Sequence, residues 1–408
     1  MPEQPIFFPR ETTLEVPASE APQLGADDYE RATGEKLGRT LDLNTWHVGV
    51  DINATYERME QEIAEATRQE AHYQKAIREQ IFGKLKTRKG APTEAGVYRT
   101  SPDALKRVHD LILFNGGTEA CDGTVVSHDT IPVTITQIGV CLVSYQGNQG
   151  SWGHRIFRRD LRSTSLQDPI QEVLDVLDKR AKRESVDSPK GDALTSMARR
   201  AIMAFAERSV LLKKSSAVWR LGHGSPTPYE LLTGSGIEPL VAPSLELMRK
   251  LISHKKFVFI PSSTKQRHWL TIGQALEPLE YAILTDLEDD LKKIAAGHYR
   301  GAWESHVENI KDFISEFGTQ VLMGLYRSSS YAPAQVFYAH KDYVHEAVHI
   351  ALADSVLQDY RGFPLLLDIA DNTCSVTFGA DVFLASTQLA YALAGTPFRY
   401  QSERSTRA

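Results

Sequence analysis

The alternation of β-rich and helical segments from about residue 100 onward constrains the fold of this chain more than any other feature. The run TVVSHDTIPVTITQIGVCLVSYQG is rich in Val, Ile and Thr, which favour strands. Helical patterns follow over 166–184 and 190–213, and strand patterns return in SAVWRLGHGS and KFVFIPSST. Strands interleaved with helices predict one α/β domain that occupies residues 100–400.

The C-terminal half continues this pattern. Residues 280–326 read as mostly helical, and PSLELMRKLISH before them is also helical. The segments QVFYAH and AVHIAL alternate apolar and polar residues as strands do. The segment LLLDIADNTCSV then predicts a helix that follows a turn at 361–364.

The N-terminal part is different in character. Residues 1–50 are rich in Pro, Glu and Thr and predict an extended arm with a few short elements. Over 52–88, apolar residues such as Ile52, Tyr56, Met59 and Ile63 recur at spacings of three and four, which predicts a long amphipathic helix. We expect residues 1–95 to form an arm and helix that serve dimer or partner contacts.

The charge balance and the cysteines exclude several classes of protein. The chain has 46 Lys and Arg against 52 Asp and Glu, so its net charge is −6, which argues against coating nucleic acid by bulk charge. Three widely spaced cysteines form no disulfide framework, and the N-terminus has no signal-peptide pattern. No apolar run approaches the roughly 18 residues of a membrane span. We therefore expect a cytoplasmic protein without membrane association.

One motif suggests a zinc protease. His345, Glu346 and His349 match HExxH, whose two histidines hold zinc when they lie on one face of a helix. The residues around this motif alternate as in a strand, and no further His and no Glu before Glu403 supplies a third ligand. A zinc metalloprotease remains an alternative hypothesis.

Separated acidic residues suggest a different metal site. Asp122, followed by Gly123, begins a β-rich run, where the glycine allows close backbone approach and the strand fixes the carboxylate. Other candidates occur in later segments, and these are Glu207 in an apolar helix, His223 between two glycines, Lys265 after an apolar strand, and Asp368 and Asp371 on one helix face. Several carboxylates that converge from separate segments are what a metal-dependent phosphodiesterase needs.

A basic cluster follows the β-rich run. It contains Arg155, Arg158, Arg159 and Arg162, with the aromatic residues Trp152 and Phe157 interleaved. Arginine pairs well with phosphate and aromatic rings stack on unpaired bases, so this segment is a candidate DNA-binding surface. A solvated face or a salt-bridge network is the alternative interpretation.

The ordered set of motifs resembles the NurA nucleases, the partners of HerA-type DNA-translocating ATPases. The resemblance covers roughly 115–385 and rests on the Asp122 turn with its strands, helical Glu207, LGHGSPTPYELL, VFIPSSTK, and the glycine–aromatic–proline stretch before LLLDIAD. It implies an RNase H-like core with a mixed β-sheet flanked by helices, a dimer of two-fold symmetry, and docking on a hexameric ATPase.

The resemblance also implies roles for individual residues. Asp122, Glu207 and Asp371 would hold Mn²⁺ or Mg²⁺, and Lys265 would lie near the scissile phosphate. The family often has Asp where this chain has His223, an imidazole that suits Mn²⁺ better than Mg²⁺ if it is a ligand at all.

We therefore predict a Mn²⁺- or Mg²⁺-dependent deoxyribonuclease that acts with a HerA-type ATPase in DNA-end processing or defence against phage. The zinc protease, an inactive DNA-binding or scaffold subunit, and a nuclease that needs no ATPase remain as alternatives.

Overall fold

The computed structural model describes residues 25–46, 52–130, 134–147, 151–159, 174, 196–262, 267–299 and 301–400. The chain divides into two compact units, Met1–Ala71 and His72–Ala408. Each unit is described by itself.

The first unit is helical. It contains α1 (Ala26–Thr33), α2 (Leu37–Leu41) and the beginning of α3 (Ile52–Gln80), and none of these helices has a buried residue. The 29-residue α3 confirms the long helix that the apolar spacing predicts. Its N-terminal apolar residues are exposed, with Tyr56 at 50% and Ile63 at 55%.

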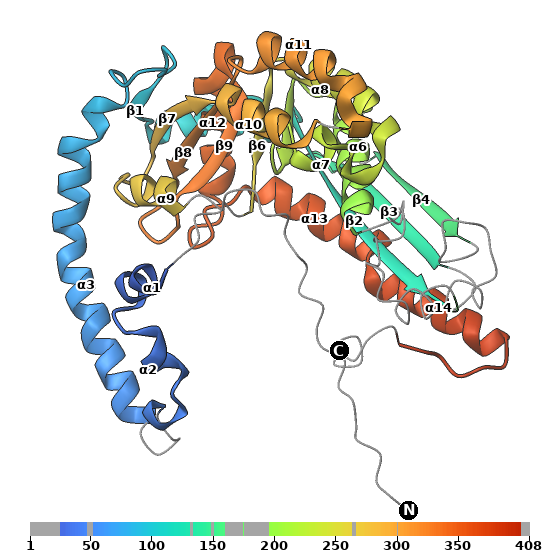
Figure 1. Ribbon diagram of the computed structural model, residues 1–408. Coiled ribbons are helices and arrows are strands. Elements are labelled where there is room, and N and C mark those ends of the chain that lie inside the picture. The colour runs from blue at the N-terminus through green and yellow to red at the C-terminus, as the bar shows by residue number, and fades with distance from the viewer. Residues whose placement is uncertain are drawn as a thin grey trace, which may run out of the picture. The chain divides into compact units, whose positions relative to one another are not determined.

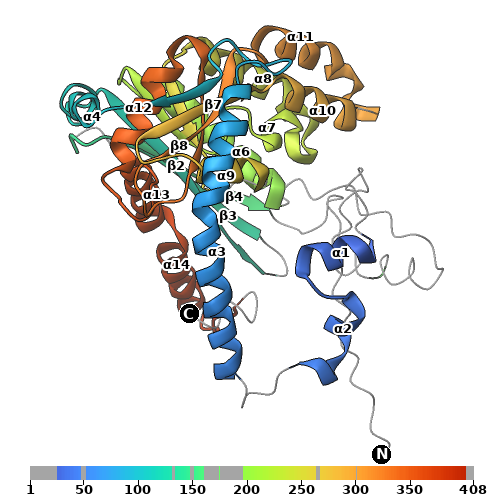
Figure 2. The ribbon, with the colours of Figure 1, turned by 90° about the vertical axis from the view of Figure 1, so that its left-hand side faces the viewer.

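The second unit is built on one sheet (Figures 1 and 2). Within the described residues it has nine strands in the order β1-β7-β8-β9-β6-β5-β2-β3-β4. The bounds are β1 Gly96–Arg99, β2 Thr118–Asp129, β3 Thr134–Val143, β4 Ser151–Arg159, β5 Trp219–His223, β6 Phe257–Ile260, β7 Glu280–Asp286, β8 Val321–Arg327 and β9 Gln335–His340. The mixed α/β class is therefore confirmed.

One half of this sheet has the strand order of an RNase H-like core. The strands β2, β3 and β4 form an antiparallel meander, and β5 and β6 then join β2 in parallel. Val, Ile and Thr dominate β3 and occur as Thr-Val-Val in β2, and such β-branched residues pack well on a pleated surface. The parallel pairing places the carboxyl ends of β5 and β6 next to each other and beside Cys121 and Asp122 in the interior of β2.

Helices cover both faces of this half. The helix α6 (Ser196–Lys213) and α13 (Leu365–Phe378) both pack against β2 and β3 (Figure 1). Their opposite placement follows from the pleat, because Val140 of β3 packs in the same cluster as α6, whereas its neighbour Cys141 packs against Cys374 of α13. The strand β2 therefore lies between two helices that each carry a predicted site residue.

The remaining helices complete the core. They are α4 (Pro102–Val108), α7 (Tyr229–Leu232), α8 (Val241–Ser253), α9 (Arg267–Gln274), α10 (Glu288–His298), α11 (Val307–Phe317), α12 (Val344–Ser355) and α14 (Ala380–Leu393). Apolar residues of α8 and α11 pack with Phe257 and Phe259 of β6, whereas α12 packs with Tyr326 and Phe337 on the second large cluster.

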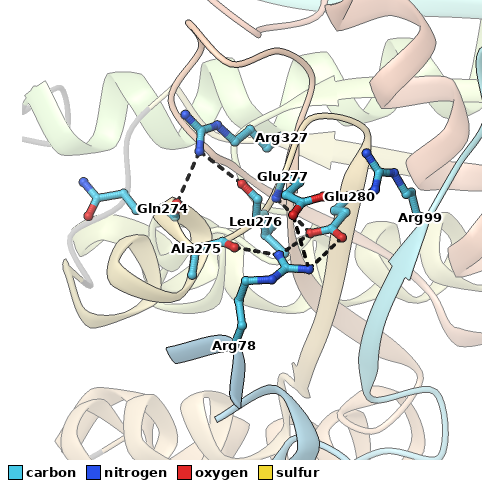
Figure 3. Close-up of polar contacts among 8 residues, drawn as sticks. All are labelled: Arg78, Arg99, Gln274, Ala275, Leu276, Glu277, Glu280 and Arg327. Carbon is cyan, nitrogen blue, oxygen red and sulfur yellow. Dashed lines mark hydrogen bonds and ion pairs between the residues drawn. The ribbon is translucent and has the colours of Figure 1, made fainter. Parts of the chain in front are cut away.

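The C-terminal end of α3 is fixed to the edge of the sheet by charge (Figure 3). Arg78 donates hydrogen bonds to both carboxylate oxygens of Glu280, at 2.7 and 3.1 Å, and to the carbonyl of Ala275 at 2.9 Å. Arg99 pairs with Glu277 at 3.0 Å beside them. These contacts join α3 to β7 in a network of paired charges.

Three sequence-based expectations need correction. The span 280–326 is helical in its middle, as α10 and α11, but the strands β7 and β8 at its two ends were not predicted. The segment AVHIAL is not a strand but part of α12, whose residues are buried on most sides, so that its apolar pattern has no clear helical period.

The third correction concerns apolar length. By length and composition alone, the stretch Leu365–Leu393 could cross a membrane. A single stretch of this kind is weak evidence for a membrane span. It consists of α13 and α14, which meet at Gly379, and α13 packs on the sheet through β2 and β3.

Candidate active site beside the end of β5

The register between two parallel strands brings Asp122 and His223 together. Cys121 of β2 pairs with Gly222 of β5, so that the next residue on each strand lies at the same edge. Oδ1 of Asp122 is 3.5 Å from Nδ1 of His223. Asp122 is only 7% exposed, and its Oδ1 also accepts a hydrogen bond from the Gly123 amide at 2.8 Å.

Both ring nitrogens of His223 have partners. Nε2 accepts a hydrogen bond from the backbone amide of Ser262 at 3.3 Å, which leaves the proton on Nδ1 facing Asp122. The Asp122 carboxylate raises the pKa of His223 above its usual value, although burial opposes this effect. The ring of Phe363, from the glycine–aromatic–proline stretch, lies edge-on at 6.1 Å. This geometry suits a histidine that orients Asp122 better than one that binds a metal.

Glu207 reaches the same region from α6 through a space that a glycine leaves open. A Cβ on Gly123 would lie 2.7 Å from Oε1 of Glu207 and 2.7 Å from Met203, so only glycine fits there. Burial raises the pKa of Glu207 to about 7, where the Arg208 charge opposes the shift and the Asp122 carboxylate adds to it. Glu207 is therefore a buried acid within the field of a second acid.

The charge of Asp371 acts within reach of Asp122, whereas Asp368 is bound by other partners. Burial and the Asp122 carboxylate raise the pKa of Asp371, so its charge lies within reach of the same site. Asp368 accepts hydrogen bonds from Arg361 and from Gln358, the latter at 2.6 Å. Asp368 thus stabilises the loop before α13, and Asp371 is the candidate ligand on this helix.

The donor types fit a hard divalent cation, but the coordination group is not preformed. Carboxylate oxygens are the ligands that Mg²⁺ and Mn²⁺ prefer. Among the residues that the structure describes, no three His, Cys, Asp or Glu side chains stand as a group that could hold a metal ion. Asp122 and Glu207 are instead engaged with His223 and Arg208. The pKa values of Glu207 and Asp371 are nevertheless raised, and a bound cation would relieve the cost of ionising these two acids.

The basic residues are only partly described. Lys265 and Arg162 lie outside the described residues, as do the side chains of Arg158 and Arg159. Arg155 is exposed on β4 and lines a cavity of about 240 Å³ with Ile138 of β3 and Ala206 of α6. Because Ala206 precedes Glu207, this cavity adjoins the helix that carries the candidate ligand.

The HExxH residues lie elsewhere, on α12. Nδ1 of His345 is 2.9 Å from the hydroxyl of Tyr281, and both His345 and His349 pack against that ring. They belong to no metal-binding group of three within the described ranges. The helix that the motif needs is present, but the third ligand is not among these residues.

Sequence reasoning missed two sets of residues near the site. Arg208 is 2% exposed and pairs with Glu207, and the adjacent charges in an apolar helix were the only available signal. Cys141 and Cys374 are buried in contact behind Asp122 and Asp371, on β3 and α13. Their pairing depends on tertiary structure alone.

Comparisons with known proteins give the following results. No family model matches the chain, and no curated protein matches it. Among solved structures, the NurA nuclease from Sulfolobus solfataricus is 10% identical with a TM-score of 0.43, and the match covers 80% of this chain and 92% of that one. A structure of NurA with manganese gives 10% identity, a TM-score of 0.39, and coverage of 77% and 94%. A structure of NurA bound to dAMP and manganese gives 10%, 0.40, and coverage of 78% and 94%. These similar structures belong to the family that the motifs of this chain resemble.

Proposed function

We propose that this chain is a nuclease that hydrolyses DNA phosphodiester bonds with a divalent cation, Mn²⁺ or Mg²⁺. What supports the proposal is the electrostatic interaction of Asp122 on β2 with Glu207 on α6 and with Asp371 on α13. Each of the latter two has a pKa raised by burial and by the Asp122 charge. Acids gathered against their mutual repulsion are typical of a site that binds a cation.

In this proposal Asp122, Glu207 and Asp371 hold the cation. The bound cation would act as a Lewis acid that offsets the charge on the phosphate as the bond to the leaving oxygen breaks. His223 keeps Asp122 oriented through its Nδ1, and the Ser262 amide fixes the tautomer of His223. Lys265 would place a further positive charge near the phosphate.

The DNA strand would follow the basic segment of β4. Arg155 stands at the cavity next to α6, and the sequence continues with Arg158, Arg159 and Arg162. Because the whole chain carries a charge of −6, binding would depend on this local surface and fall steeply with salt.

We extend the proposal to the oligomeric state, the cellular location and the partner of the chain. The chain would form a homodimer in the cytoplasm and work with a HerA-type hexameric ATPase in DNA-end processing or phage defence. Exposed apolar residues on α14, such as Leu389 at 60% and Leu393 at 81%, offer surface for such contacts. Light scattering of the purified chain, alone and mixed with the ATPase, tests these contacts.

Digestion of linear and circular DNA tests the activity itself. The wild type is incubated with Mn²⁺, Mg²⁺ or EDTA, with and without the candidate ATPase. Cleavage that needs the metal and disappears in Asp122→Ala supports the proposal. Cleavage that survives this substitution would remove Asp122 from the site. DNA binding without cleavage under every condition would favour the scaffold alternative.

A further inference from the structure

We propose that Arg208 is a positioning residue, which holds Glu207 and the turn after β5 in one arrangement and leaves a single oxygen of Glu207 free for the cation. This inference rests on the proposed function. It assigns a role to a side chain that is itself no metal ligand, because a guanidinium is a permanent cation.

Arg208 links α6 to the end of β5 and to the turn that follows it. Its Nη1 donates to Oε2 of Glu207 at 3.2 Å and to the carbonyl of Ala204 at 3.0 Å. Its Nη2 donates to the carbonyl of Ser225 and, at 3.5 Å, to that of His223. One planar group therefore fixes the acid on the helix and the backbone that presents the histidine.

A rigid platform holds the guanidinium in place. Its central carbon lies 5.2 Å from the centre of the Phe259 ring, within the range of cation–π attraction. The ring is itself wedged against β5, because a Cβ on Gly222 would lie 2.2 Å from Phe259. The turn then bends at Gly224, which has φ +83°. Few alternative positions remain for Arg208.

The consequence for Glu207 follows from its two oxygens. Oε2 is occupied by Arg208, whereas Oε1 faces the open space at Gly123. The carboxylate therefore offers one oxygen, on the side of Gly123, while Arg208 holds the other. The positive charge of Arg208 repels a cation, so a purely electrostatic role predicts that its removal tightens metal binding. A positioning role predicts the opposite.

Arg220 provides a matched control on the same strand as His223. It is also a buried arginine, at 8% exposure, and donates to the carbonyls of Leu211 at 3.2 Å and Ala217 at 2.6 Å. Its charged neighbour is Glu119, which is not a site residue. Replacing Arg220 should therefore lower the stability of the fold without removing a contact to Asp122, Glu207 or Asp371.

The test is the affinity of the full chain for Mn²⁺ alone, measured by electron paramagnetic resonance in wild type, Arg208→Lys, Arg208→Gln and Arg220→Lys. We expect both Arg208 variants to bind Mn²⁺ at least about 10-fold more weakly, as do other losses of groups that orient ligands. Arg220→Lys should stay within about twofold of wild type while it lowers the melting temperature.

Other outcomes overturn the inference in distinguishable ways. Wild-type affinity or tighter binding in folded Arg208→Lys would contradict positioning, and so would equal weakening in Arg208→Lys and Arg220→Lys. A wild type that binds no Mn²⁺ would instead overturn the proposed function on which the inference rests.

If the Arg208 variants do not fold, Phe259→Leu decides the question. It removes the ring beneath the guanidinium and leaves every charge in place. We expect weaker Mn²⁺ binding in this variant, by a smaller factor than for Arg208→Gln, and unchanged affinity would overturn the role of Arg208.

Discussion

Two buried glutamates, each beside an arginine, have opposite electrostatics in this molecule. At the β7 edge, Glu280 receives two hydrogen bonds from Arg78 and one from the Glu277 amide at 2.8 Å. Burial would raise its pKa, but these hydrogen bonds leave the pKa below the usual value. On α6, Glu207 receives one hydrogen bond from Arg208 at 3.2 Å, and burial raises its pKa to about 7.

The difference shows how a structural acid can be told from a functional one. The positive charge of Arg78 compensates the carboxylate of Glu280, and this ion pair joins α3 to the sheet. Glu207 shares the Arg208 guanidinium with the backbone carbonyls of His223 and Ser225, and the Asp122 charge raises its pKa further. A buried acid whose negative charge is not fully compensated destabilises a fold, and such residues concentrate at functional sites.

The largest expected effect separates the two acids of α13. Asp371→Asn should lower DNA cleavage at least about 10²-fold, since a transition-state stabilising group is lost. Asp368→Asn should keep most of the activity, because Asp368 is held by Arg361 and Gln358. Initial rates on linear DNA at saturating Mn²⁺ measure both. Equal losses would mean that the C-terminal ligand is misassigned.

A second effect concerns stability. Glu280→Gln should lower the free energy of unfolding by about 2 kcal/mol, because it leaves Arg78 without its carboxylate. Glu207→Gln should cost less than about 1 kcal/mol at pH 7, since with a pKa of about 7 half of the chains already carry the neutral acid. Urea unfolding of metal-free protein compares them. The reverse order would contradict the contrast between the two acids.

The pH dependence of stability should differ in sign at the two acids. The raised pKa of Glu207 means that metal-free protein loses stability as pH rises from about 4.5 to about 7. The lowered pKa of Glu280 means that its stabilisation is present above about 4.5 and is lost as pH falls through its own pKa. Glu207→Gln should flatten the first slope and Glu280→Gln the second. Unfolding midpoints over pH 3–8 give both slopes.

The smallest effect concerns the DNA surface. Arg155→Ala should reduce the slope of log affinity against log salt by about 1, because one phosphate contact is lost. Arg99→Ala is the control, since Arg99 is an exposed arginine paired with Glu277 at the β7 edge. Fluorescence anisotropy on single-stranded DNA measures the slopes. An unchanged slope for Arg155→Ala would exclude this residue from the DNA path.

Much of the fold was predictable because the apolar pattern is local. The β-branched run gave β2 and β3, and the spacing of three and four gave α3. The pattern failed at α12, where burial on most sides removes the helical period, and at β7 and β8, where nearly continuous burial removes the alternation of a half-exposed strand.

The site was predictable in its parts but not in its connections. Recognisable local signals mark Asp122, Glu207 and Asp371. Gly123, beside Asp122, allows the close approach to the backbone that the sequence predicts. The partners of His223 and the link through Arg208 depend on how β5, β6 and α6 pack. No local pattern encodes such contacts between distant segments.

The most direct test of the central claim is Mn²⁺ binding by the metal-free chain and by the variants Asp122→Asn, Glu207→Gln, Asp371→Asn and Glu280→Gln, measured by calorimetry. We predict saturable binding in the wild type and in Glu280→Gln, and its loss in the other three. A wild type without binding, or variants of the three site acids that bind as the wild type does, would contradict the assignment of a cation site beside Asp122 and the end of β5.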